Sequence, residues 1–230
     1  MIDKEVTDAA AAVADVPDGA TLMIGGFGPP GQPVHLIEAL LELGTTDLTV
    51  INNNAGAGGE AISQLFAARR VRKVICSFPK AIGSTVFDEL YLAGEIELEL
   101  IPQGTLAERI RAAGAGIGGF YTRTGYGTEL AEGKEVRELD GKHYVFERPL
   151  AADFALIKAH SADPMGNLVY RKTARNFGPV MATAARTTIA EVDHVVPVGA
   201  LDPEAIVTPG IYVDRFIRSV PAAARKEASS

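Results

Sequence analysis

The sequence predicts a three-layer α/β fold, in which an open and mostly parallel β-sheet carries helices on both faces. Short apolar runs alternate with helical patterns up to about residue 114. A glycine- and proline-rich loop joins the first apolar run to the first helical pattern, and buried strand patterns return after residue 152. This alternation is typical of parallel sheets whose crossover connections are helices.

The first half of the chain contains four apolar runs that are interpreted as strands, at residues 22–24, 48–51, 74–76 and 96–101. Apolar residues at helical spacing follow them in VHLIEALLEL, EAISQLFAARR, STVFDELYLAG and LAERIRAAG. Right-handed crossovers place the carboxyl ends of such strands at one edge of the sheet. Ligands of open α/β sheets bind outside that edge, so the loops after these strands are the candidate site.

The second half begins with a change of pattern. GIGGFYTRTGYGT predicts a long loop, and EVRELDGKHYVFE predicts a hairpin that turns at Asp140-Gly141. ADFALIKAH and VDHVVPVG are expected to be buried strands, with a helix in NFGPVMATAARTTI between them. We expect one domain over residues 1–221, with an insertion at about 115–150, and a flexible tail at 222–230.

Composition excludes several classes of function. The chain has 47% hydrophobic and 22% charged residues, which is typical of a globular protein, and its net charge of −7 disfavours nucleic acid as a partner. No signal-peptide pattern and no apolar run of about eighteen residues is present, so we expect a cytoplasmic protein without a membrane span. The single cysteine, Cys76, excludes an internal disulfide, and the four histidines lack metal-ligand spacing, so no metal site is expected.

The string DGATLMIGGFGPPGQP at residues 18–33 is the first candidate for ligand binding. Its glycines permit backbone angles closed to other residues and a close main-chain approach to a ligand. The helix N-terminus behind the loop suits an oxyanion, a carboxylate or a phosphate, although an ordinary strand-to-helix turn would give the same pattern. The candidate segment comprises Gly25, Gly26, Phe27, Gly28, Pro29, Pro30 and Gly31.

Neutral amides follow two of the other strands. Asn52, Asn53 and Asn54 come after the second strand, and Gln103 comes after the fourth. Amides at a shared sheet edge could orient a thioester carbonyl or a carboxylate, whereas the alternative is turn and capping chemistry. Arg171 and Arg175 could meet an anionic substrate or belong to a solvated surface. His160 lies at a possible strand end and could have a role in the site or be a hydrogen-bonded structural histidine, and Cys76 is interpreted as a small buried residue.

These motifs together resemble family I coenzyme A transferases. The resemblance rests on Asp18-Gly19, Leu22-Met23-Ile24 and Gly25-Gly26-Phe27, with Gly31 and Pro33 at the family's spacing, and extends through NNAG and PQGTLAERIRAAGAG to about residue 216. It implies that the glycine segment contacts coenzyme A or substrate. It also implies that Asn53, Asn54 and Gln103 lie at the substrate site.

The resemblance further implies a division of labour between two chains. The family's nucleophile is a glutamate in a Ser-Glu-Asn-Gly segment of the B half, and this chain has no such segment. Glu60, the carboxylate nearest to a candidate loop, opens a helix and is not expected to replace it. The chain is therefore similar to an A subunit without a catalytic residue of its own, which would work with a B subunit in a heterodimer or an A2B2 heterotetramer.

Within the family, segments such as GYGTELAEGKE and NLVYRKTARNFGPVMATAA resemble most closely the enzymes of the β-ketoadipate pathway. This likeness implies transfer of coenzyme A from succinyl-CoA to a 3-oxo acid, 3-oxoadipate first, with acetoacetate or a short-chain fatty acid as alternatives. Coenzyme A would be a substrate, and no tightly bound cofactor is expected. A dinucleotide-binding oxidoreductase and a non-catalytic ligand-binding protein are alternatives of other classes, although GGFGPPG lacks the G-x-G-x-x-G order.

Overall fold

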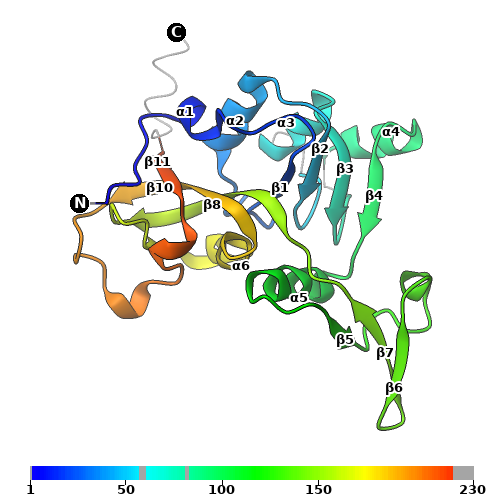
Figure 1. Ribbon diagram of the computed structural model, residues 1–230. Helices are drawn as coiled ribbons and strands as arrows, with labels where there is room; N and C mark the ends of the chain where they lie inside the picture. Colours follow the sequence, from blue (N-terminus) through cyan, green and yellow to red (C-terminus); the bar gives the residue numbers. More distant parts are fainter. Residues whose placement is uncertain (1, 57–60, 81–82, 220–230) are drawn as a thin grey trace.

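A mostly parallel sheet forms the centre of the computed structural model, which describes residues 2–56, 61–80 and 83–219 (Figure 1). Its strand order is β11-β10-β8-β1-β2-β3-β4, with the short β9 pairing antiparallel to β8. The order places β1 at the centre of the sheet, with β2 on one side and β8 on the other. The strands of this sheet are β1 (Thr21–Ile24), β2 (Leu48–Ile51), β3 (Val71–Cys76), β4 (Glu97–Leu100), β8 (Ala152–Ala162), β9 (Leu168–Val169), β10 (Ala185–Val195) and β11 (Arg215–Arg218).

Helices cover both faces of the sheet, as Figure 1 shows. One apolar core packs beneath the first four helices and includes Leu36, Leu65 and Phe87; the other lies beneath the last two and includes Ile110 and Met181. The centre of the sheet is therefore buried on both sides, which explains why β1 and β2 are short apolar runs without alternation. The helices are α1 (Ala9–Val13), α2 (Val34–Leu43), α3 (Ala61–Ala67), α4 (Val86–Leu92), α5 (Gln103–Gly114) and α6 (Gly178–Ala182).

A second, three-stranded antiparallel sheet projects from the main body (Figure 1). It contains β5 (Phe120–Thr122), β6 (Val136–Leu139) and β7 (Lys142–Glu147), in the order β5-β7-β6. Asp140 and Gly141 both have a positive φ at the tip of the β6–β7 hairpin, which is the backbone that an Asp-Gly turn favours. Short 3₁₀ turns complete the chain at Glu129–Ala131, Lys172–Arg175, Pro203–Ala205 and Gly210–Tyr212.

The α/β fold class and the predicted strands and helices up to residue 114 are confirmed, with shifts at some ends. Two expectations in the second half are wrong in part. The supposed loop after residue 115 contains β5, which pairs with β7. The supposed helix in NFGPVMATAARTTI ends at Ala182, and β10 begins at Ala185, because its β-branched residues pair with β8 in the sheet. The expected tail at 222–230 lies outside the described residues.

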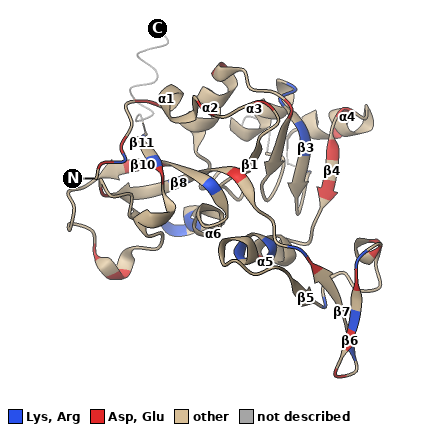
Figure 2. Cartoon of the chain, in the orientation of Figure 1, with Lys and Arg blue, Asp and Glu red and all other residues tan. Residues whose placement is uncertain are grey.

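Charged side chains of opposite sign face one another at the β3–β4 side of the main sheet. Figure 2 shows acidic residues on β4 beside basic residues on β3 and α5. Lys73 and Arg109 both pair with Glu99, at 2.9 and 3.0 Å, and these contacts outweigh partial burial to lower the pKa of that carboxyl. These pairs join β4 to its neighbours. Within the described ranges, no helix is long and apolar enough to cross a membrane.

Candidate active site

The loops that follow β1, β2, β3 and β4 lie along one edge of the main sheet, because these strands are parallel neighbours. Their described residues are 25–33, 52–56, 77–80 and 101–102. None of these residues is a carboxylate, a histidine or a cysteine. This edge therefore offers amides, a hydroxyl, one lysine and main-chain N–H groups, which can hold an acyl oxygen but cannot attack an acyl carbon as a carboxylate does.

Asn53 and Gln103, predicted separately from two loops, are in direct contact. The Gln103 Nε2 atom donates to Asn53 Oδ1 over 2.8 Å, and the Ser77 hydroxyl donates to the same oxygen over 2.9 Å. Two donors at one atom fix the orientation of the Asn53 amide. Its Nδ2 amino group makes no hydrogen bond within the described part of the chain, and this leaves a positioned donor at a side chain that is only 4% exposed.

The other two asparagines contact the backbone. Asn52 is buried and donates from Nδ2 to the carbonyl oxygen of Ile24 over 2.5 Å, which joins the ends of β1 and β2. Its Oδ1 accepts from the Asn54 N–H, and the Asn54 Oδ1 accepts from the Gly56 N–H over 3.1 Å. Asn52 and the Oδ1 atom of Asn54 thus take part in turn structure, which was the alternative to a role in substrate binding. Contact between Asn54 and substrate stays a prediction.

The glycine loop adopts a backbone that only glycine takes readily at three of its positions. Gly26, Gly28 and Gly31 have φ values of 132°, 63° and 87°. A Cβ on Gly31 would lie 2.6 Å from the Asn176 Nδ2 atom, whereas a Cβ on Gly28 would meet nothing within 4 Å. The Gly28 N–H makes no hydrogen bond to the described residues, so it is the loop's candidate donor to a ligand.

Asn176 holds the glycine loop in place from the second half of the chain, and no pattern in the sequence predicts this role. Its Oδ1 accepts from the Gly26 N–H over 3.2 Å, and its Nδ2 donates to the Pro30 carbonyl oxygen over 2.9 Å. The same Nδ2 donates to the Thr173 carbonyl oxygen over 2.9 Å. One side chain therefore ties both ends of the loop to the segment that precedes α6.

The N-terminus of α2, directly after the loop, receives a carboxylate from the protein itself. Glu191 on β10 accepts from the main-chain N–H groups of His35 and Leu36 at 2.8 and 3.4 Å, and from His35 Nδ1 at 2.8 Å. The favourable interaction of a helix N-terminus with negative charge is thus satisfied internally. Contrary to the expectation from the sequence, these two N–H groups are not free for an external anion.

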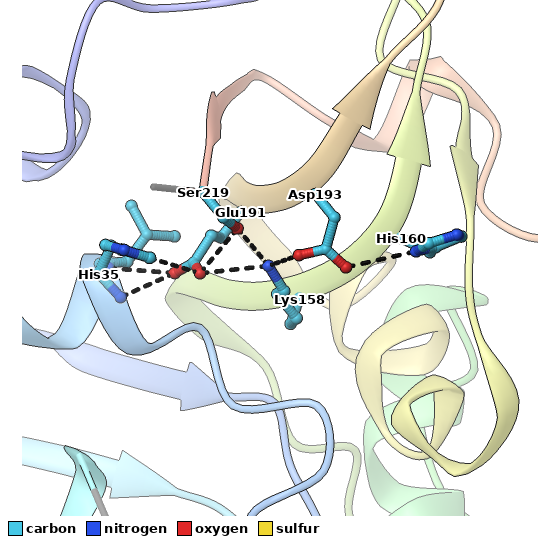
Figure 3. Close-up of polar contacts among 7 residues, drawn as sticks. His35, Lys158, His160, Glu191, Asp193 and Ser219 are labelled. Atoms are coloured by element: carbon cyan, nitrogen blue, oxygen red, sulfur yellow. Dashed lines mark hydrogen bonds and ion pairs between the residues drawn. The ribbon is translucent and has the colours of Figure 1, made fainter. Parts of the chain in front are cut away.

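Glu191 belongs to a row of charged groups along β8 and β10 (Figure 3). Lys158 Nζ lies 3.3 Å from Glu191 and 2.6 Å from Asp193, and the Ser219 hydroxyl contacts both Lys158 and Glu191. His160 lies 3.3 Å from Asp193 at the far end. Burial alone would raise the pKa of both carboxyls, but the contacts with His35, Lys158 and His160 outweigh burial and lower the pKa of each.

The remaining candidates are not arranged for nucleophilic or metal chemistry. Cys76 is fully buried at the end of β3, and burial raises its pKa to about 12, so the thiol stays protonated at neutral pH. Among the described residues, no group of three or more His, Cys, Asp or Glu side chains could hold a metal ion. Glu60 lies outside the described residues.

This sheet edge, with its oriented amide and no carboxylate among the described residues of its loops, can be compared with known proteins. A family model described as coenzyme A transferase matches residues 6–219. The chain belongs to the coenzyme A transferase family. This membership argues against the dinucleotide-binding alternative, and the geometry agrees, because the α2 N-terminus that would receive a pyrophosphate is occupied by Glu191.

Relatives within the coenzyme A transferase family span a range of organisms. The chain is 60% identical over 224 residues to the A subunit of 3-oxoadipate CoA-transferase from Pseudomonas putida, with 97% of each chain covered. It is 48% identical to human succinyl-CoA:3-ketoacid coenzyme A transferase 2, mitochondrial, covering 94% of this chain and 45% of the human one. The Escherichia coli O157:H7 acyl-CoA transferase YdiF superposes with a TM-score of 0.82 at 24% identity, over 94% of this chain and 47% of that chain.

Proposed function

We propose that this chain is the A subunit of a transferase that moves coenzyme A from succinyl-CoA to a 3-oxo acid, with 3-oxoadipate as the preferred acceptor. The similarity to the P. putida protein over nearly the whole of both chains supports this acceptor. The human relative, whose name specifies a 3-ketoacid, makes acetoacetate the second candidate. Coenzyme A is a substrate in this proposal, and no bound cofactor takes part.

The observation that carries the proposal is the oriented Asn53 amide, with no carboxylate among the described residues of the loops after β1 to β4. An acyl oxygen placed at Asn53 Nδ2 would receive a hydrogen bond from a donor whose position Gln103 and Ser77 fix in advance. Such a donor stabilises the negative charge that develops when a nucleophile adds to the thioester carbonyl. No carboxylate is among the described residues of this edge, so in this proposal the nucleophilic carboxylate comes from another chain.

The reaction proceeds through the partner's glutamate in this proposal. Its carboxylate adds to the thioester carbonyl, and the carbon–sulfur bond breaks to release the coenzyme A thiolate and leave an acyl anhydride. The thiolate then attacks the glutamyl carbonyl, which forms a glutamyl thioester and releases succinate. The 3-oxo acid repeats the two steps in reverse. At each addition the negative charge on the oxygen lies beside the amide donors of the A subunit.

We also propose that a separate B subunit supplies this glutamate, in a heterodimer or an A2B2 heterotetramer. The human relative and YdiF are each more than twice as long as the part that matches this chain, which leaves room in them for a second half. The P. putida relative, whose name makes it one subunit of its enzyme, matches this chain over 97% of both lengths. A two-chain assembly accounts for both observations.

The test is a reconstitution assay with the purified chain, its B partner and their mixture. We expect no transfer from succinyl-CoA to 3-oxoadipate by either chain alone and full turnover by the mixture, because the nucleophile and the amide donors lie on different chains. Coenzyme A should be found covalently attached to the B chain by mass spectrometry when acceptor is withheld.

Two results would contradict the proposal. Turnover by this chain alone, shown free of partner, would mean that the nucleophile lies within it. A mixture that assembles but transfers nothing would favour the non-catalytic alternative. The ratio of kcat/KM for 3-oxoadipate and acetoacetate in the active mixture decides between the two acceptors.

A further inference from the structure

A pocket of about 360 Å³ lies on the opposite side of the glycine loop from Asn53. One wall is the glycine loop itself at residues 29–32, and a second is the end of β8 at residues 158–160. The third wall is residues 171–174, which Asn176 ties to the loop. The volume suits a small organic anion rather than a whole coenzyme A molecule.

The charges around this pocket do not balance. Lys158, Arg171 and Lys172 line it, against the single carboxylate of Asp193. Lys158 and Asp193 pair with each other at 2.6 Å, and Lys158 also contacts the buried Glu191 behind it. Arg171 and Lys172 are exposed and make no ion pair or side-chain hydrogen bond within the described part of the chain. Two positive side chains thus face a pocket whose other charges are already neutralised.

The segment that carries these two cations is held in a defined conformation. Lys172 has a φ of 50°, a left-handed conformation that is uncommon for a residue other than glycine. Asn176 donates to the carbonyl oxygens of both Thr173 and Pro30 over 2.9 Å, so the cationic wall and the glycine loop are joined by one side chain. A strained backbone conformation that neighbouring side chains hold in place is typical of binding sites.

The pocket and the amide pair are close enough for one substrate to reach both. β8 and β2 flank β1, and both Ile51 and Ala155 are paired with Met23, so Asn53 is level with Ile157, the residue before Lys158. At this level β2 and β8 are two strand spacings apart, about 10 Å. Arg171 and Lys172 line the pocket beside residues 158–160 of β8, on the far side of β1 from Asn53. A dicarboxylic acyl group, with its thioester at one end and a free carboxylate at the other, has the length and the charge for this gap.

We propose that Arg171 and Lys172 bind the free carboxylate of the dicarboxylic acyl group while its thioester carbonyl lies at Asn53; this inference rests on the proposed function. A guanidinium matches a carboxylate with two parallel hydrogen bonds, and the neighbouring ammonium adds charge. The phosphates of coenzyme A are the other source of anionic oxygens. The pantetheine arm separates them from the thioester by many more bonds than the three that separate the two ends of a succinyl group.

Steady-state kinetics of the assembled complex distinguish the two sources. Arg171→Gln and Lys172→Gln, singly and together, are compared with Arg186→Gln, which removes the same charge from an exposed arginine at the start of β10, at the opposite edge of the sheet. We expect the double variant to raise KM for succinyl-CoA and for 3-oxoadipate at least about tenfold. KM for acetoacetyl-CoA and for acetoacetate, which lack the second carboxylate, should stay within twofold, as should all values for Arg186→Gln.

Two kinetic results would overturn the inference. An equal rise in KM for acetoacetyl-CoA and succinyl-CoA would assign the pocket to coenzyme A phosphates. Unchanged KM for all substrates would assign Arg171 and Lys172 to the solvated surface. Circular dichroism of each variant serves as the folding control.

Calorimetry with succinate alone separates failure of this inference from failure of the proposed function. Succinate should bind the wild-type assembled complex at least about tenfold more tightly than the double variant. Butyrate, which lacks the second carboxylate, should bind both proteins equally weakly. Equal succinate affinity in the two proteins would overturn the inference even if the complex transfers coenzyme A, and unequal affinity would support it even if the acceptor acid is a different one.

Discussion

The two flanks of the glycine loop use opposite chemistry at the same sheet edge. On the β2–β4 side, Asn53, Ser77 and Gln103 form a neutral network of hydrogen bonds. On the β8–β10 side, the buried Glu191 and the half-buried Lys158 belong to a row of charged groups. The neutral flank leaves an amide donor available, whereas the row on the charged flank directs its donors to its own carboxylates and leaves Arg171 and Lys172, beside it, without a carboxylate partner among the described residues.

The neutral amides of one flank are suited to holding the reacting acyl oxygen, whereas the row of charged groups on the other flank holds the loop and the start of α2 in place. A neutral amide can hold an acyl oxygen without adding a charge that would compete with the attacking carboxylate. The buried charges on the other flank are costly unless each has a partner, and here the partners are the N-terminus of α2, Lys158 and Ser219. They fix where the loop ends and α2 begins.

The largest effect is expected on the neutral flank. Gln103→Ala removes a donor that orients the Asn53 amide, so kcat of the assembled complex should fall about a hundredfold, comparable to the loss of one oxyanion donor. KM should change little, because the interaction strengthens in the transition state. Gln64→Ala, an exposed glutamine on α3, is the matched control. An unchanged kcat in Gln103→Ala would show that Gln103 does not contribute to catalysis. The proposed difference between the two flanks would then no longer hold.

A smaller effect is expected from the loop between the flanks. Gly31→Ala should lower the free energy of unfolding by about 2 to 4 kcal/mol, since a left-handed alanine is strained and its Cβ would press on Asn176 and on the carbonyl oxygen of Ala174. Gly44→Ala has a similar φ of 82° with nothing within 4 Å of its Cβ, and should lose only about 1 kcal/mol. Denaturant unfolding measures both, and equal losses would show that Asn176 does not confine the loop.

The smallest effect is expected on the charged flank and depends on pH. The pKa of Glu191 is lowered in the folded protein, so its stabilisation is fully present above its ordinary value of 4.5 and is lost as the pH falls through the folded value. Glu191→Gln should cost about 1 to 3 kcal/mol at pH 7 and less below pH 4. Glu42→Gln, an exposed residue of α2, should have no such dependence. If the free energy of unfolding changed with pH in the same way in wild type and in Glu191→Gln, the charge of Glu191 would not be what holds the start of α2.

Much of the neutral flank could be predicted from the sequence, because local patterns determine it. The apolar run at residues 48–51 and the helical spacing at 34–43 match β2 and α2 residue for residue. Parallel strands share one carboxyl edge, so the meeting of Asn53 with Gln103 follows from the order of strands and loops.

The charged flank could not be predicted in this way. Its contacts join residues that are more than a hundred positions apart, such as His35 with Glu191 and Gly26 with Asn176. The charge of Glu191 inside the apolar run of β10 was a signal that it needs a partner, but no pattern indicates which one. For the same reason α6 ends early: the pairing of Thr187, Thr188 and Ile189 with β8 overrides their place in a helical pattern.

The anchoring of the glycine loop by Asn176 and Glu191 has a consequence for the timing of folding. During synthesis Gly26 of the loop leaves the ribosome 150 residues before Asn176, and Leu36 of α2 leaves it 155 residues before Glu191. β1 also waits for β8 to complete its pairing. Contacts between residues so far apart in the sequence form slowly, because the entropy of closing the long intervening chain is lost before the contacts contribute any stabilisation. A nascent chain that ends before β10 therefore carries every residue of the loop and the amide pair, yet it lacks the carboxylate that sets the start of α2. The start of α2 is therefore fixed only after the last strands are complete.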